Sequence, residues 1–113
     1  MNGEWKSNWH ESEEGNAYKD IPEHPIKLDF TGCRYIMQFH EILKVQLGLP
    51  EYYGKNWGAL WDLMDGYRSY PTVIEIYGLN DLPKELQPAV EKMFVIFDRV
   101  HQYSPYIEFI RVS

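Results

Sequence analysis

Cysteine is almost absent from this chain, whose 113 residues include only Cys33. A single thiol excludes an internal disulfide and a cysteine-based metal cluster, and it is what a reducing compartment permits. We expect Cys33 to be a small buried side chain and not a nucleophile. Long apolar runs are also missing, and residues 1–14 lack the basic-then-apolar order of a signal peptide. The sequence therefore predicts a cytoplasmic protein without membrane contact.

Positive charge is scarce as well. The chain has 11 Lys and Arg against 17 Asp and Glu, which gives a net charge of −6. Phosphate binding requires clustered cations, so this balance argues against nucleic acid as a direct ligand. It suits either a basic protein partner, which the acidic chain would attract, or a cytosolic protein that its charge keeps soluble.

The signatures of common enzyme classes are missing from the sequence. It has no glycine-rich phosphate loop, no nucleophile elbow and no His-Glu-x-x-His pair. We therefore expect no catalytic residue, no metal site and no cofactor. His40 is expected on the surface of a helix. None of the four histidines has a partner at the spacing of metal ligands: His10, His24, His40 and His101.

Apolar residues make up 44% of the chain, enough for a core without metal or disulfide support. We expect one domain over residues 26–113, preceded by an N-terminal extension, residues 1–25. The extension is polar except for Trp5, Trp9 and Tyr18, which suggests that it docks somewhere on the domain.

Hydrophobic periodicity predicts three strands separated by helices. This order predicts an α/β fold: a small three-stranded parallel sheet with right-handed crossovers, in which a single layer of strands packs on flanking helices. The expected elements are a strand over 26–30, helices over 36–47 and 57–65, a strand over 72–77, a short helix over 83–86, a helix over 88–100 and a strand over 106–112.

Residues 49–62 crowd aromatic side chains and glycines around the start of the second expected helix. Tyr and Trp often dominate binding energy, so this stretch indicates a surface for protein recognition. Tyr52 and Tyr53 lie in a loop before a glycine, where surface recognition and burial are equally compatible with the sequence. Trp57 is expected to be structural, whereas Trp61 lies near the edge of the apolar side and is expected to be shared between core and surface.

The second expected helix has a polar side as well. Asn56 is suited to cap its start and Gly66 to end it. At about 100° per residue, Gly58, Asp62 and Asp65 fall on the side opposite the apolar residues. The Asp62 carboxylate should therefore face outward, one turn after a glycine that leaves its approach open.

One long run resembles the barstar family of ribonuclease inhibitors. The likeness extends over about residues 26–113. It is strongest in one run of unusual composition, and the positions Gly66 and Tyr70-Pro71 after that run match as well. The matching run is Leu49-Pro50-Glu51-Tyr52-Tyr53-Gly54-x-Asn56-x-x-Ala59-Leu60-Trp61-Asp62.

The resemblance implies a fold of three parallel strands with flanking helices, and it implies a mechanism. The second helix and its preceding loop would cover the active-site groove of a cognate ribonuclease or related toxin, in a 1:1 complex. The Asp62 carboxylate would take the place of a substrate phosphate, and Tyr52 would cover the area used by a base. The implied partner-binding residues are Tyr52, Tyr53, Gly54, Asn56, Gly58, Trp61, Asp62, Asp65, Gly66 and Tyr67.

This chain departs from the family pattern at several positions. Gly58 stands where a second acidic residue is expected, Arg99 falls near the place of a glutamate, and Tyr67 replaces a tryptophan. Residues 49–71 carry a net charge of only −1. Either the partner has a less basic rim, or the N-terminal extension supplies the missing acidity. Tight binding to barnase itself is not expected.

Two other functions are compatible with the sequence. The same binding surface could recognise a toxin that is not a ribonuclease, or a host protein. Alternatively, the aromatic residues could line the cleft of a small enzyme or ligand-binding domain, for example for sugars. The position of Asp62 separates these classes, because a binding role requires it on a convex helix and a catalytic role requires it in a concavity. We expect an inhibitor that is monomeric when free.

Overall fold

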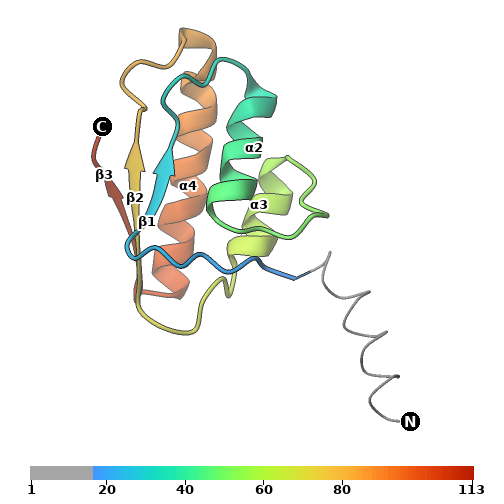
Figure 1. Cartoon of the computed structure of the whole chain (residues 1–113), viewed down its shortest axis with the longest axis vertical. Coiled ribbons are helices and arrows are strands. Elements are labelled where there is room, and N and C mark those ends of the chain that lie inside the picture. Colours follow the sequence, from blue (N-terminus) through green and yellow to red (C-terminus); the bar gives the residue numbers. More distant parts are fainter. Residues whose placement is uncertain (1–16) are drawn as a thin grey trace.

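Residues 17–113 are described by the structure, a computed structural model, and they form three strands, three α-helices and one short 3₁₀-helix (Figure 1). The elements expected from the sequence are present in the expected order, so the predicted α/β fold is confirmed. Their bounds are β1 (Ile26–Asp29), α2 (Ile36–Gln46), α3 (Trp57–Met64), β2 (Thr72–Tyr77), η1 (Lys84–Leu86), α4 (Gln87–Tyr103) and β3 (Ile107–Arg111).

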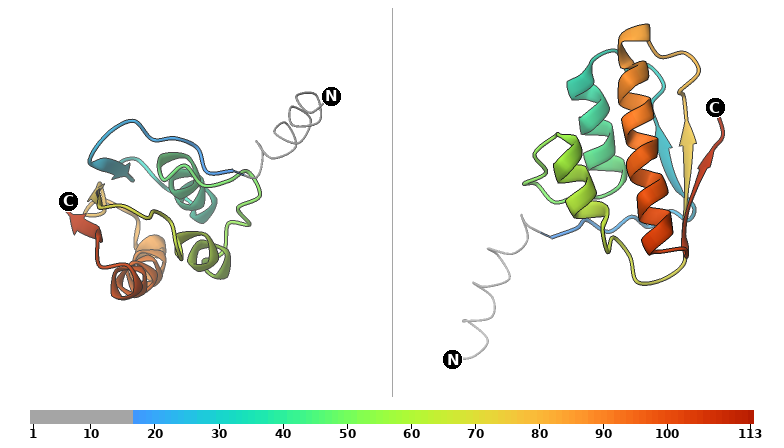
Figure 2. Two further views of the ribbon diagram at one scale, coloured as in Figure 1. Left: turned by 90° about the horizontal axis from the view of Figure 1, so that it is seen from below. Right: turned by 180° about the vertical axis from the view of Figure 1, so that it is seen from behind.

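The strands form one parallel sheet in the order β1-β2-β3. Ile26 of β1 lies opposite Ile74 of β2, and Thr72 of β2 lies opposite Ile107 of β3. Parallel neighbours need crossover connections, which the helices supply. Because α2, α3 and α4 lie on one face of the sheet (Figure 2), buried and exposed residues alternate along β1. The predicted single layer of strands packed on helices is confirmed.

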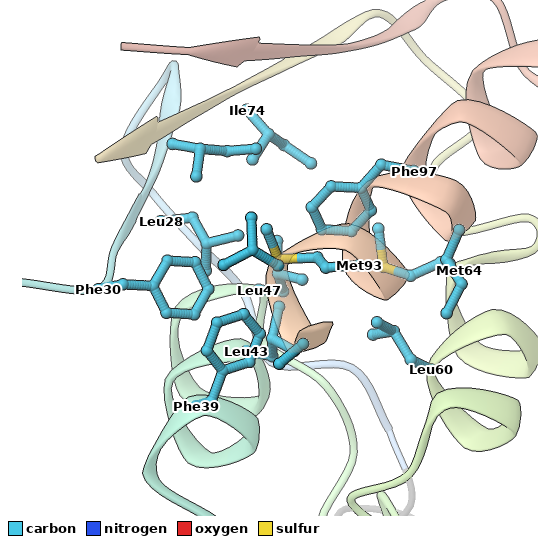
Figure 3. Packing of buried hydrophobic residues seen from close by; sticks show 14 of the residues in the cluster. Leu28, Phe30, Phe39, Leu43, Leu47, Leu60, Met64, Ile74, Met93 and Phe97 are labelled. Atoms are coloured by element: carbon cyan, nitrogen blue, oxygen red, sulfur yellow. The ribbon is translucent and has the colours of Figure 1, made fainter. Parts of the chain in front are cut away.

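Side chains from β1, β2 and all three α-helices meet in one core (Figure 3). Phe30, just after β1, stacks on Phe39 of α2 with ring centroids 4.3 Å apart, and neither ring is exposed. Cys33 is 4% exposed, which confirms that it is a small buried side chain. The core fixes α3 to the rest of the protein. Figure 3 labels Leu28, Phe30, Phe39, Leu43, Leu47, Leu60, Met64, Ile74, Met93 and Phe97.

The segment just before β1 packs on the domain. The Tyr18 hydroxyl donates a hydrogen bond of 2.5 Å to the carbonyl of Leu63 in α3, and the Tyr18 ring lies edge-on to Tyr67. The Lys19 N–H donates to the Gly48 carbonyl at 2.7 Å. A Cβ at Gly48 would lie 2.5 Å from the Lys19 carbonyl oxygen, so only glycine fits there. The segment is therefore held against α3 and the loop that precedes it.

Candidate protein-binding site

The start of α3 is fixed by its own sequence. The Asn56 side chain accepts a hydrogen bond of 2.8 Å from the Ala59 N–H, which satisfies one of the free backbone donors at the helix start. This confirms the predicted cap. A Cβ on Gly58 would meet only Asn56 Oδ1, at 3.5 Å, so the surface beside the first turn is open. After the helix, Gly66 has φ of +75°, a conformation that favours glycine and ends the helix.

Asp62 lies on the exposed face of α3. Leu60, Leu63 and Met64 are buried on the opposite side, while Asp62 and Asp65 are exposed. Within residues 17–113, the Asp62 carboxylate makes no ion pair and accepts no hydrogen bond. The predicted outward orientation is confirmed, and the carboxylate is available to another molecule.

The two tyrosines of the loop have opposite environments. Tyr52 is 58% exposed, whereas Tyr53 is 5% exposed. The Tyr53 hydroxyl and His40 Nδ1 share a hydrogen bond of 2.6 Å, and burial raises the pKa of Tyr53. Tyr52 is therefore accessible to a partner, whereas Tyr53 supports the loop from beneath.

The expectation that His40 lies on a helix surface is wrong. His40 is 3% exposed, because the loop before α3 and the start of that helix cover it. Its ring centroid lies 4.6 Å from that of Trp57, in addition to the hydrogen bond to Tyr53. Burial, and then the positive charge of Lys55, lower the pKa of His40. His40 therefore connects α2 to both the loop before α3 and the start of α3.

The lowered pKa of His40 predicts a pH dependence of stability. The unfolded chain takes up a proton at a pH at which the folded ring stays neutral, so the free energy of unfolding should decrease as the pH falls below about 6.5. Urea denaturation at a series of pH values measures this decrease. The decrease should be clearly smaller in His40→Gln, which keeps a partner for Tyr53, and what remains should come from carboxyl groups such as Glu41 and Glu51, whose pKa values are lowered. The exposed His24, replaced in His24→Gln, serves as the matched control; an unchanged slope in His40→Gln would contradict the assignment.

Ion pairs attach the loop to α2. Lys44 Nζ lies 2.9 Å from Glu51, and Lys55 Nζ lies 2.9 Å from Glu41. A hydrogen bond from Lys44 lowers the pKa of Glu51, and one from Lys55 lowers that of Glu41. Such exposed pairs add little to stability but orient the side chains that form them. The charges of Glu51 and Lys55 are thus engaged within the protein, which leaves Asp62 and Asp65 as the acids of this region without an ion pair inside residues 17–113.

Tyr67 supports the other end of α3. It is 4% exposed, and its hydroxyl donates a hydrogen bond to the Leu47 carbonyl. Burial raises the pKa of Tyr67 to about 12. The Arg68 guanidinium lies 4.3 Å from the centroid of the Tyr67 ring. Tyr67 was expected among the partner-binding residues, and in the free protein its buried side chain positions the chain after α3.

The remaining aromatic residue of the site, Trp61, is half-buried, as expected for a side chain shared between core and surface. Of the ten residues proposed from the sequence, Tyr53 and Tyr67 are buried. The structure places the others at an accessible surface along the loop and α3: Tyr52, Gly54, Asn56, Gly58, Trp61, Asp62, Asp65 and Gly66.

The site is not a cavity. A depression of about 410 Å³ lies beside β1 and α2, and Asp62 lines neither it nor the four smaller cavities described in residues 17–113. In the same range, no group of three His, Cys, Asp or Glu residues is arranged to hold a metal ion. Nor does this range contain a helix with the length and apolarity to cross a membrane. The geometry is that expected of a protein-binding surface: it is exposed, and it presents Asp62 and Asp65 as carboxylates without an ion pair in residues 17–113.

Comparison with known proteins agrees with this class. Residues 23–109 match the Barstar family, described as barstar (barnase inhibitor), and the chain belongs to that family. The Bacillus subtilis (strain 168) protein named "Putative ribonuclease inhibitor YrdF" is 37% identical over 49 residues, which are 43% of this chain and 54% of that protein. The match thus spans about half the length of that relative.

Proposed function

We propose that the chain binds a ribonuclease and blocks its active site, with the Asp62 carboxylate in the place of a substrate phosphate. The observation that carries the proposal is an exposed Asp62 without an ion pair in residues 17–113, on α3 of a barstar-family fold. A ribonuclease must hold phosphate with cationic groups. A carboxylate that enters such a site forms charge-assisted hydrogen bonds, which are stronger than neutral ones.

The surroundings of Asp62 suit a partner that approaches closely. Gly54 and Gly58 present no side chain, and the exposed ring of Tyr52 offers a flat apolar face for the area that a base would occupy. Asn56 and Gly66 would form the rim. We propose a 1:1 complex, a free monomer, and a cytoplasmic protein that protects its own cell from a toxic nuclease. No residue of the chain is assigned a catalytic role.

The test is to capture a partner with the full chain and then to assay that partner. A captured protein that degrades RNA, and that the chain inhibits competitively and completely at one equivalent, supports the proposal. Bait carrying Asp62→Ala is the matched control and should not capture it. Inhibition that is non-competitive with RNA would contradict active-site blockade.

The second candidate is the same surface directed at a toxin that is not a ribonuclease, or at a host protein. A captured partner without activity on RNA, still dependent on Asp62, would favour it. The third candidate, a small enzyme or ligand-binding domain, is disfavoured because Asp62 lies on an exposed helix face and lines none of the described cavities.

The N-terminal extension offers a separate prediction. Residues 1–16 carry four Glu against one Lys, and they include Trp5 and Trp9. They lie outside the residues that the structure describes. If this acidity attracts a basic nuclease, removing residues 1–16 should slow association, most strongly at low salt. The cut falls after residue 16 because Tyr18 and Lys19 contact the domain.

Stopped-flow or surface-plasmon measurements of the association rate test this role. A chain of full length with its four N-terminal glutamates changed to glutamine is the matched control, and it should reproduce the slower rate. An unchanged rate at low salt would remove the extension from the mechanism.

A further inference from the structure

The exposed face of α4 carries a cation and an aromatic ring beside the proposed site. Arg99 and Tyr103 are exposed and lie one helical turn apart. The Arg99 guanidinium lies 4.9 Å from the centroid of the Trp61 ring, and the Tyr103 ring lies 5.9 Å from it. Figure 2 shows α4 running alongside α3, so these residues extend the surface of α3 across to the next helix.

We propose that Arg99, held over Trp61, is a specificity-determining residue that selects a ribonuclease presenting a carboxylate at this point and rejects one presenting a cation. This inference rests on the proposed function, since it concerns the partner that would cover Asp62. It assigns two opposite charges to the binding surface: an anion on α3 and a cation on α4.

The size of a stable interface is large enough to include Arg99. Such an interface buries about 800 Å² on each partner, which corresponds to a patch about 16 Å in radius. Trp61 immediately precedes Asp62, and neighbouring Cα atoms are about 3.8 Å apart. Because the Arg99 guanidinium lies 4.9 Å from the Trp61 ring, we expect a protein centred on Asp62 to reach Arg99 as well.

The surface is also hollowed beside this cluster. A groove of about 320 Å³ between α3 and α4 is lined by Trp57, Val95 and Lys92, among others. Val95 is 64% exposed. The groove can take a side chain of a protein that lies across both helices, which supports a binding surface wider than α3 alone.

The charge of Arg99 is available to a partner. Within residues 17–113, ion pairs engage Lys19, Lys44 and Lys55 but not Arg99. The aromatic face of Trp61 holds the guanidinium by a cation–π contact without neutralising it. Like charges brought together across an interface oppose binding, whereas opposite charges fix the register of the partners. Since an RNA-binding groove is cationic, Arg99 would repel an ordinary rim of that groove and would favour one that carries an acid.

The test uses barnase as the probe, because an RNA-cleaving enzyme carries the cationic groove that Arg99 should oppose. Arg99→Glu should bind barnase at least about tenfold more tightly than the parent chain at low salt, Arg99→Gln should lie between them, and the gain should shrink as salt rises. The matched control is Arg34→Glu, which makes the same charge change at an exposed position between β1 and α2. It should raise the affinity less than Arg99→Glu does at low salt, and by less than about twofold at about 0.15 M salt, where the Debye length is about 8 Å.

The outcomes separate this inference from the proposed function. If Arg99→Glu binds barnase no better than Arg34→Glu, including the case in which neither binding is detectable, the inference is overturned. If Arg99→Glu gives the gain but Asp62→Ala weakens binding in neither the parent nor the Arg99→Glu background, Arg99 governs binding and the phosphate-mimic function of Asp62 fails. A gain from Arg99→Glu together with a large loss from Asp62→Ala in the Arg99→Glu background supports both.

Discussion

Asp62→Ala should abolish most of the ribonuclease inhibition while leaving the protein as stable as before. Residues that anchor an interface contribute about 2 to 4 kcal/mol or more when truncated, a general range for which the barstar–barnase pair is itself one of the examples. The loss should be large because the variant leaves the cations of the nuclease buried and unpaired. Stability should change by less than about 0.5 kcal/mol, since Asp62 is exposed and makes no ion pair within residues 17–113.

Inhibition titrations and urea denaturation of the same samples measure both quantities. Asp62→Asn keeps the shape of the side chain but removes its charge, so it should be nearly as weak an inhibitor as Asp62→Ala. The control is Asp81→Ala, which removes an exposed carboxylate from the turn before η1 and should inhibit like the parent. If Asp62→Ala inhibits as well as the parent chain, the phosphate-mimic mechanism is wrong.

The fold could be predicted from the sequence because each element repeats a simple pattern along the chain. The alternation Ile26-Lys27-Leu28-Asp29 indicated a half-buried strand, and burial alternates along β1 in the same way. The order of strands and helices then favoured parallel pairing. The ends were less accurate: the third strand runs over Ile107–Arg111 and not over 106–112, because pairing with β2 sets the length of β3.

The polar parts of the site were predictable for a similar reason. The cap by Asn56 and the outward position of Asp62 follow from the geometry of one helix, which the local sequence determines. The supports beneath the site were not predictable in this way. The His40–Tyr53 hydrogen bond joins residues 13 positions apart, and the contact of Tyr18 with Leu63 joins residues 45 apart.

The error over His40 shows where local patterns stop being informative. Ile36, Phe39, Leu43 and Leu47 have helical spacing, which indicated a buried face without His40. In the structure Ile36 is 43% exposed, whereas His40 is buried beside Phe39 and Leu43. The buried face of α2 is therefore turned toward the loop before α3. Which residues of α2 are buried depends on where that loop packs, and the spacing within α2 does not show this.

Phe39→Ala should lower the free energy of unfolding by about 3–5 kcal/mol, which is the usual cost of truncating a fully buried phenylalanine. Phe39 has no exposed surface, stacks on Phe30, and lies edge-on to Trp57 with centroids 6.1 Å apart. Its removal leaves a cavity between β1, α2 and the first residue of α3. Helix propensity offsets little of this cost, because alanine exceeds phenylalanine by less than about 1 kcal/mol.

Urea denaturation measures the loss, and Met37→Ala provides the matched control on the same helix. Met37 is 55% exposed, so its truncation should change stability by less than about 0.5 kcal/mol. Phe39 packs against Trp57 at the start of α3. Phe39→Ala should therefore also weaken ribonuclease binding under conditions in which the variant is still folded. A loss of stability equal to that of Met37→Ala would mean that the ring is not part of the core. Unchanged affinity in the folded variant would mean that α3 keeps its position without it.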